Sequence, residues 1–409
     1  MLKDLSRADI LPLINLGKER DDFINLKIKE LSGKFSSPYP EPREYWNTVF
    51  DGFRVFPERL DNFIQAKEIS NRSAVQASKP YLIDLEPNSR CNFRCTMCQV
   101  SEWARGQRAR DMTFEEFQSL KSLFTFVIEA KIHGMGEPLL HKEFFNMVEY
   151  LKSYSIWTRT SINGSLLLVN NNIEKLVKSS LGEIQISLDG ATKETYEKIR
   201  VRANFEKVTK GIIELNSACE SNNRKLTRMW VVLQKNNIHE LAAFVEVAKE
   251  LKFKKLTFSL SLNDWGQELW RDKNGTKGIA LESTIDKIKG LFEKSIGEGL
   301  EISLWQQSNK YSVNKGPQDL CPWIFDRTYI TSDMRLTPCA IIGNPDITDL
   351  GDASAILNSW SSEKYVSFRK LHLTGAIPNE CTSCYRDEGV QVDVPGSKQI
   401  FVDISKREQ

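Results

Sequence analysis

Strands and helices alternate along the middle of the chain, as the spacing of its hydrophobic residues indicates. From Tyr81 onward, short apolar segments of strand length are followed by stretches whose apolar residues recur at helical period. The predicted strands are "YLIDLE", "FVIEAKIHG", "WTRTSIN", "EIQISLD", "MWVVLQ" and "LTFSLSL". The predicted helices are "TFEEFQSLKSLF", "HKEFFNMVEYLKSY", "NIEKLVKSS", "KVTKGIIELNSACES" and "IHELAAFVEVAKEL". Repeated strand–helix units predict an α/β fold with a parallel sheet and helices outside it.

Two of the predicted strands alternate between apolar and polar residues. A parallel strand that is covered on both faces usually reads as a continuous apolar run. Here the polar faces carry Gln185, Ser187 and Asp189 on one strand, and Thr257, Ser259, Ser261 and Asn263 on the other. Polar faces on inner strands favour an open barrel whose lumen holds a polar ligand. The alternative is a pair of edge strands that each present one face to water.

Composition and charge narrow the class of protein. The chain has 409 residues, of which 40% are hydrophobic and 27% are charged, as in ordinary globular proteins. Its net charge of +2 makes no electrostatic case for nucleic acid or an acidic membrane as a partner. The first residues make a poor signal peptide, and no stretch reaches the roughly 18 apolar residues that span a bilayer. We therefore expect a cytoplasmic protein, in which clustered cysteines bind metals or do redox chemistry.

The eight cysteines fall into two groups and one single residue. "CNFRCTMC" holds Cys91, Cys95 and Cys98; the second group is Cys321, Cys339, Cys381 and Cys384; Cys219 stands alone. Three thiolates on one loop hold three corners of a four-iron cluster and leave the fourth iron open to another ligand. A structural zinc site, which is the alternative, wants four protein ligands.

The three-cysteine loop resembles the signature of the radical S-adenosylmethionine (SAM) superfamily. It has the spacing C-x3-C-x2-C and stands directly after the first predicted strand. In that family the open iron of a [4Fe–4S] cluster is chelated by the amino and carboxylate groups of SAM. The resemblance implies a partial (β/α)6 barrel with its site at the carboxyl ends of the strands. It also implies cleavage of SAM to a 5′-deoxyadenosyl radical that abstracts a hydrogen atom from substrate.

Further motifs of that family follow in order, each near a predicted strand end. "GMGEP" resembles the Gly-Gly-Glu-Pro motif, where backbone at Gly134 and Gly136 approaches the methionine amino group and Glu137 supports it. Met135 stands where a second glycine is common. "SING" resembles an Asn-Gly motif that puts Asn163 near the ligand.

The next motifs concern the rest of the cofactor. "SLDG" puts Ser187 near the carboxylate or ribose of SAM, with Asp189 beside it. Arg200 matches an arginine that often pairs with that carboxylate, and a surface salt bridge is the alternative for it. Met97 stands where the backbone of the cysteine loop meets adenine.

The later cysteines resemble the auxiliary-cluster extension called SPASM, or its shorter form called twitch. The full form holds two clusters and needs further cysteines; none follows Cys384, so the resemblance implies one second [4Fe–4S] cluster. Met334 occupies the hairpin turn where a glycine is usual. Zinc held by the same four thiolates is the alternative.

The predicted domains follow from these motifs. Residues 1–79 form an N-terminal helical extension without a catalytic motif, and residues 80–305 form the radical SAM partial barrel. Residues 306–395 form the auxiliary-cluster domain, and residues 396–409 form a tail.

The resemblance implies an oxidoreductase that takes electrons from a donor such as flavodoxin or ferredoxin. With one auxiliary cluster, its closest pattern is the aminocyclitol dehydrogenase of butirosin biosynthesis, so we expect oxidation of a sugar or aminocyclitol alcohol. Epimerisation or crosslinking of a ribosomally made peptide is the alternative, and a non-catalytic zinc scaffold is a remote one. Candidate substrate residues at the barrel mouth are Glu86, Gln234, Ser261 and Asn263, covered by the segment around Trp265. Cys219 ends a helix away from that mouth and is expected to be structural.

Overall fold

The computed structural model describes residues 5–68, 72–104, 106–108, 110–260, 264–274, 281–305, 311–313 and 316–385. Two of the candidate substrate residues, Ser261 and Asn263, lie outside this part of the chain. The end of the predicted auxiliary-cluster domain and the predicted tail also lie outside it.

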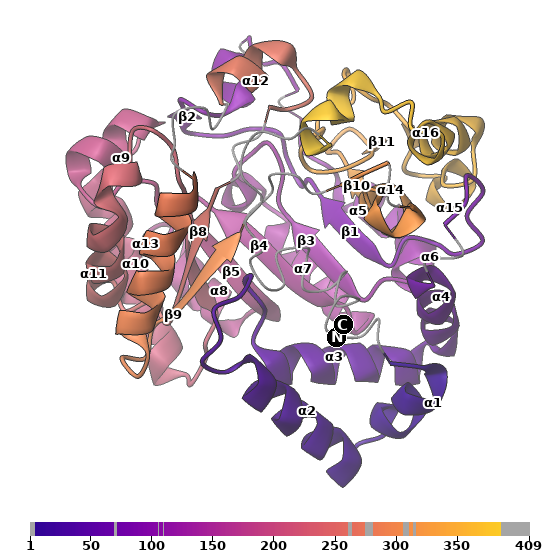
Figure 1. Cartoon of the computed structure of the whole chain (residues 1–409), viewed down its shortest axis with the longest axis horizontal. Helices are drawn as coiled ribbons and strands as arrows, with labels where there is room; N and C mark the ends of the chain where they lie inside the picture. Colours follow the sequence, from indigo (N-terminus) through magenta and orange to yellow (C-terminus); the bar gives the residue numbers. More distant parts are fainter. Residues whose placement is uncertain are drawn as a thin grey trace.

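One curved sheet of ten strands organises the described residues, in the order β12-β11-β10-β1-β3-β4-β5-β7-β8-β9 (Figure 1). All strands from β10 to β9 in this order run parallel, and only β11 and β12 pair in antiparallel fashion. The strands are β1 (Leu82–Leu85), β3 (Glu129–Ile132), β4 (Trp157–Ile162), β5 (Leu181–Ser187), β7 (Thr227–Val232), β8 (Lys255–Ser259), β9 (Glu301–Trp305), β10 (Arg327–Ile330), β11 (Arg335–Thr337) and β12 (Gly351–Asp352). The predicted parallel α/β fold is therefore confirmed.

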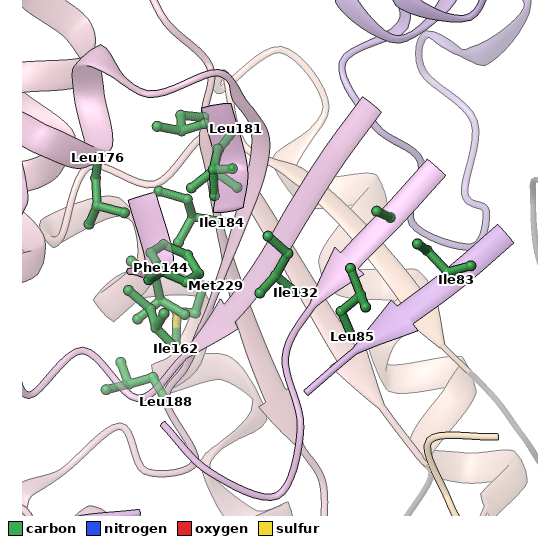
Figure 2. Packing of buried hydrophobic residues seen from close by; sticks show 14 of the residues in the cluster. Ile83, Leu85, Ile132, Phe144, Ile162, Leu176, Leu181, Ile184, Leu188 and Met229 are labelled. Carbon is green, nitrogen blue, oxygen red and sulfur yellow. The ribbon is translucent and has the colours of Figure 1, made fainter. Parts of the chain in front are cut away.

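Helices cover the outer face of this sheet and bury its apolar side chains. They are α5 (Phe114–Ser119), α6 (Lys121–Phe124), α7 (Phe144–Ser153), α8 (Asn172–Lys178), α9 (Lys193–Ile199), α10 (Phe205–Ser221), α11 (Leu241–Glu250) and α13 (Leu281–Ser295). Figure 2 shows side chains such as Ile132, Ile184 and Met229 packed in this core. Within the described residues, no helix combines the length and the apolar character needed to cross a bilayer.

The inner face of the sheet is polar, as the alternation in two strands predicted. The Lys131 ammonium and the Ser161 hydroxyl both donate to Gln185 Oε1, at 3.0 and 2.9 Å. Arg228 pairs with Glu183 at 3.0 Å, and the hydroxyls of Thr257 and Ser303 lie 2.8 Å apart. The edge-strand alternative is wrong, because β5 and β8 each pair with strands on both sides.

The N-terminal helices lie at the amino end of the parallel strands, opposite α12 (Glu268–Lys273) in Figure 1. Trp46, Phe50 and Phe63 form a second core there with Tyr81 and Trp157. The helices are α1 (Arg7–Ile10), α2 (Lys18–Leu31), α3 (Pro42–Val55) and α4 (Pro57–Lys67).

A buried arginine fixes these helices to the sheet. The Arg59 guanidinium donates to four backbone carbonyls at 2.8–3.1 Å, those of Phe124, Thr125, Tyr154 and Ser155. These carbonyls stand at the carboxyl ends of α6 and α7, where backbone acceptors lack helical partners. The N-terminal helices therefore cover the end of the sheet that lies away from the predicted site.

The C-terminal segment continues the sheet rather than standing apart from it. Its strand β10 pairs in parallel register with β1, with Asp84 opposite Tyr329. The hairpin to β11 turns through Met334, whose φ of 62° is the left-handed conformation that favours the glycine usual in that turn. The helices α14 (Trp323–Asp326), α15 (Ile356–Ser359) and α16 (Glu363–Leu373) pack beside it. The predicted boundary at residue 305 stays a prediction.

Candidate active site

The three-cysteine loop leaves the carboxyl end of β1 and is held by a short ribbon. Its strand β2 (Arg94–Cys95) pairs in antiparallel fashion with β6 (Arg200–Val201), so that Cys95 lies opposite Arg200. The Thr96 amide then donates to the Ile199 carbonyl at 2.9 Å. The ribbon therefore fixes the thiols above the carboxyl ends of the parallel strands, at the edge of the sheet where the predicted site lies.

The two glycines of "GMGEP" stand where a side chain would collide with neighbouring protein atoms. A Cβ on Gly134 would lie 2.4 Å from Glu86 Cγ and 2.8 Å from Tyr329 Oη. A Cβ on Gly136 would lie 2.4–2.5 Å from the carbonyl oxygens of Asn88 and Arg90. Close packing of the protein on this loop is thus sufficient to require glycine, whereas the predicted approach to the methionine amino group stays a prediction.

Glu137 links this loop to the end of β4. Its carboxylate accepts from the Asn163 amide at 2.8 Å and from the Leu139 amide at 3.3 Å. Burial raises the pKa of Glu137 to about 7, against the effect of these two hydrogen bonds. The Asn163 side chain donates to Asn92 Oδ1 at 2.9 Å and lies 4.0 Å from Cys91 Sγ. Both predicted residues therefore lie beside the cysteine loop.

Arg200 and Asp189 form a buried ion pair next to the thiols. Arg200 Nε donates to Asp189 Oδ2 at 2.8 Å, and Nη1 lies 3.9 Å from Cys95 Sγ. Asp189 also accepts from the Val232 amide at 2.8 Å. Burial opposes the charge on Arg200, but Asp189, Cys95 and Tyr196 together outweigh it and raise the pKa of the guanidinium. Since Arg200 is only 7% exposed, the surface salt bridge is wrong.

The other predicted site residues occupy different positions around this centre. Ser187 is half-buried at the end of β5, opposite Trp230 of β7. Gln234 is buried beyond the end of β7, and its Nε2 has no hydrogen-bond partner within the described part of the chain. Met97 is half-buried against the outer core, and its carbonyl accepts from Asn274 Nδ2 at 3.0 Å. Glu86 is fully buried and its carboxylate is surrounded by donors.

The segment around α12 covers the cysteine loop. Gln267 Nε2 donates to Gln99 Oε1 at 2.9 Å, and Lys273 forms an ion pair with Glu102. Trp265, which we expected to cover the barrel mouth, has a left-handed φ of 57° and is half-buried. The predicted cover therefore contacts the 3-10 helix Gln99–Glu102, which directly follows the cysteine loop.

The three thiols of this loop suit a cationic cluster. Burial, reinforced by neighbouring negative charges, raises the pKa of Cys91 and of Cys98 to about 12. Cys95 is among those neighbours for both residues. A cation bound to all three would favour the thiolate form that ligation requires. Among the described residues no three or more His, Cys, Asp or Glu side chains lie together in a way that would bind one single metal ion. This is compatible with a four-iron cube, which separates its thiolates because each binds a different iron.

The four later cysteines are brought together from separate segments. Cys321 precedes α14, Cys339 follows β11, and Cys381 and Cys384 lie in a 3-10 helix (Asn379–Cys384). Burial and then repulsion from the charges of Cys321 and Cys384 raise the pKa of Cys339. Burial and the other three cysteines likewise raise the pKa of Cys381. These four thiols are thus close enough to interact electrostatically and suit one auxiliary cluster.

Aromatic side chains flank this second site. The Cys321 amide donates to Tyr385 Oη at 3.0 Å, and that hydroxyl lies 2.9 Å from His372 Nδ1. Tyr311 packs on Tyr385 with ring centroids 5.6 Å apart. Burial lowers the pKa of His372 to about 4, so its ring is neutral at pH 7.

Several inner-face residues near the site were not predicted from sequence. His133 Nε2 lies 2.8 Å from Asp84, and Asp84 also pairs with Arg327 at 3.0 Å. Lys131 lies on β3, two residues before His133. Burial lowers the pKa of Lys131 to about 7. The alternation of Lys131 and His133 with apolar residues in "EAKIHG" is the same signal that identified β5 and β8.

Cys219 lies in the last turn of α10, shortly before the amino end of β7, and is 3% exposed. Burial raises the pKa of its thiol to about 11. It lies at the end of the sheet opposite the cysteine loop, as predicted.

Residues 85–248 match the radical SAM superfamily. The mycofactocin maturase MftC of Mycolicibacterium smegmatis is 24% identical over 222 residues, which are 54% of this chain and 53% of the relative. The GTP 3′,8-cyclase of Chlorobaculum tepidum is 30% identical over 163 residues, 40% of this chain and 48% of the relative. The chain spans about half the length of these curated relatives.

Solved structures share the fold over more of the chain. SuiB of Streptococcus suis, bound to the precursor peptide SuiA, has a TM-score of 0.58 at 14% identity, covering 88% of this chain and 82% of SuiB. The structure of anSMEcpe with bound AdoMet has a TM-score of 0.56 at 17% identity, covering 77% of this chain and 92% of that one. At such identities the likeness is one of fold.

Proposed function

We propose that this chain, whose residues 85–248 match the radical SAM superfamily, is a radical SAM enzyme. The enzyme cleaves SAM reductively at the Cys91–Cys98 loop and modifies a peptide substrate on the inner face of its sheet. The observation that carries this proposal is the convergence of Glu137, Asn163 and the Asp189–Arg200 pair on the three thiols.

The groups around the thiols match the charges of an amino acid cofactor. Glu137 presents a carboxylate to the ammonium group of SAM, and Arg200 presents a guanidinium to its carboxylate. Asp189 holds that guanidinium in place, and Asn163 ties the Glu137 carboxylate to the cysteine loop. When bound, the [4Fe–4S] cluster with SAM supplies the 5′-deoxyadenosyl radical that removes a hydrogen atom from substrate.

The inner face offers a substrate both apolar and polar contacts. The half-buried Trp230 and Trp305 lie on β7 and β9 with ring centroids 6.3 Å apart. Across the sheet, His133 Nε2 is hydrogen-bonded to Asp84, while Lys131 Nζ donates to Gln185. A peptide supplies side chains and backbone for both kinds of contact. The names of a maturase relative and of a peptide-bound structure with the same fold support this class.

A second candidate is oxidation of a sugar or aminocyclitol alcohol. It is favoured by the single set of four thiols, Cys321, Cys339, Cys381 and Cys384, because one auxiliary [4Fe–4S] cluster suffices to accept one electron from a substrate radical. In both candidates an external protein such as flavodoxin or ferredoxin supplies the first electron.

Deuterium transfer distinguishes these candidates. The reconstituted enzyme is reduced anaerobically with SAM and either peptides encoded by neighbouring genes or cyclic polyols, each deuterated on carbon. Mass spectrometry then measures deuterium in 5′-deoxyadenosine. We expect transfer from a peptide. Transfer only from a polyol would favour the second candidate, and absence of reductive SAM cleavage under all conditions would overturn both.

A further inference from the structure

Glu86, which the sequence suggested as a substrate residue, is surrounded by hydrogen-bond donors of the protein. Its Oε1 accepts from the Met135 amide at 3.0 Å and from Tyr329 Oη at 3.4 Å. Its Oε2 accepts from the amide and hydroxyl of Ser332, both at 3.0 Å, and from Arg108 Nη2 at 3.1 Å. The side chain is completely buried.

This set of contacts leaves no acceptor site for a substrate. A carboxylate has about four lone-pair positions, and five donors already approach this one. Glu86 is therefore poorly placed to take a proton from a bound molecule.

The two oxygens of Glu86 face different parts of the chain. Oε1 accepts a hydrogen bond from the backbone amide of Met135, the second residue of the "GMGEP" loop. Oε2 holds Ser332, at the tip of the hairpin between β10 and β11. That hairpin is part of the connection between the auxiliary ligands Cys321 and Cys339. One buried carboxylate thus joins the loop of the first site to the segment that carries the second.

We propose that Glu86 is a positioning residue that couples the C-terminal hairpin to the loop that binds the methionine end of SAM. This inference rests on the proposed use of the "GMGEP" loop for SAM. Glu86 does not touch the cofactor; it sets the position of Met135 and so of Gly134 and Gly136 on either side. The contact is tight, since a Cβ on Gly134 would lie 2.4 Å from Glu86 Cγ.

Glu86→Gln tests this coupling with little change in shape. A glutamine has one acceptor oxygen and one NH2 group, which can only donate. Whichever way the amide is turned, its NH2 group faces a backbone N–H, either that of Met135 or that of Ser332. The variant must therefore release one of the two segments that the carboxylate holds together.

The measurement is the affinity of the reconstituted iron-loaded protein for radiolabelled SAM, by anaerobic equilibrium dialysis, together with iron content and melting temperature. We expect Glu86→Gln to bind SAM about tenfold more weakly at unchanged iron content, as for loss of a hydrogen bond to a charged group. Glu129→Gln is the matched control, because Glu129 is also buried and paired with Arg159 at 2.7 Å, but lies at the amino end of β3. We expect that variant to melt earlier with unchanged SAM affinity.

A second variant keeps the inference testable if Glu86→Gln does not fold. Ser332→Ala removes only the hydroxyl donor at 3.0 Å, and we expect SAM to bind two- to threefold more weakly. Its effect should be absent in a Glu86→Gln background, because both changes act through one contact. Wild-type SAM affinity in Glu86→Gln or Ser332→Ala, or equal losses in Glu86→Gln and Glu129→Gln, would overturn the inference. Failure of the wild-type protein to bind SAM would instead overturn the proposed function.

Discussion

The two cysteine sites of this protein are built in opposite ways. Cys91, Cys95 and Cys98 lie within eight residues on one loop, and a two-stranded ribbon holds that loop over the sheet. The other four thiols come from three segments that meet only when the β10–β11 hairpin and the 3-10 helix at Asn379–Cys384 are folded. A local motif therefore makes the first site, whereas the tertiary structure makes the second.

Their surroundings differ as well. The first site has the buried Asp189–Arg200 ion pair and the carboxyl group of Glu137 within reach of the thiols. The second has the Tyr385 hydroxyl and the neutral ring of His372. The ion pair beside the first site suits the binding of a zwitterionic cofactor. The second site instead has aromatic neighbours and the Glu380 side chain, whose charge adds to the repulsion on Cys381.

Removing the first site should have the largest effect. Changing Cys91, Cys95 and Cys98 together to Ala removes all three proposed ligands, so reductive SAM cleavage should fall to the background rate. Iron should fall from about eight to about four per chain, because the second cluster is retained. The measurements are 5′-deoxyadenosine by chromatography and iron by mass spectrometry. Unchanged SAM cleavage would contradict the assignment of this loop.

Removing the second site should act mainly on stability and turnover. In Cys381→Ala/Cys384→Ala the 3-10 helix loses its two thiol ligands, so the melting temperature should fall, since a structural metal site contributes to folding. Some SAM cleavage should persist while substrate turnover is strongly reduced. A protein with four irons and stoichiometric zinc in the wild type would show that the second site is a zinc site.

The pH dependence of SAM binding should report on Glu137. Its raised pKa of about 7 means that the buried carboxyl is neutral below that pH and cannot attract the ammonium of SAM. SAM affinity should therefore rise with pH up to about 7, by at most tenfold per pH unit, and level off above it. In the SAM-free protein the sign for stability is opposite, because the stability gained from the raised pKa is lost as pH rises through about 7.

Glu137→Gln is the control for this pH dependence. The glutamine keeps the shape of the side chain but does not titrate, so SAM affinity should be low and nearly independent of pH. A wild-type profile without an inflection near pH 7, or a variant that keeps that inflection, would assign it to another group.

Cys219 belongs to neither site, so Cys219→Ala should have the smallest effect on activity and stability. Its thiol is buried in the last turn of α10, so the loss of one sulfur atom should destabilise the fold by about 1 kcal/mol. Chemical denaturation measures this loss of stability. Iron content and substrate turnover, measured by metal analysis and activity assay, should stay unchanged. Loss of turnover in a stably folded variant would indicate a thiol that donates hydrogen, as a peptide epimerase needs.

Sequence alone determined the parts of this protein that depend on neighbours in the chain. The period-two alternation predicted the polar inner face, and helical periodicity predicted α7, α8, α10 and α11. The cysteine loop and the residues Glu137 and Asn163 were recognisable because each lies in a short motif. The carboxyl ends of parallel strands meet at one edge of a sheet, which is why these motifs converge.

Only the tertiary structure decided which side chains that are far apart in the sequence contact one another. The pairing of β10 with β1 brings Tyr329 and Ser332 to Glu86, and so turns a candidate substrate residue into an internal connection. The Asp84–Arg327 pair likewise depends on that register. The alternation of side chains along a strand says which face a residue occupies, but not which strand lies beside it. That choice depends on packing the whole sheet, because every strand edge offers the same kinds of backbone donors and acceptors whatever its side chains are.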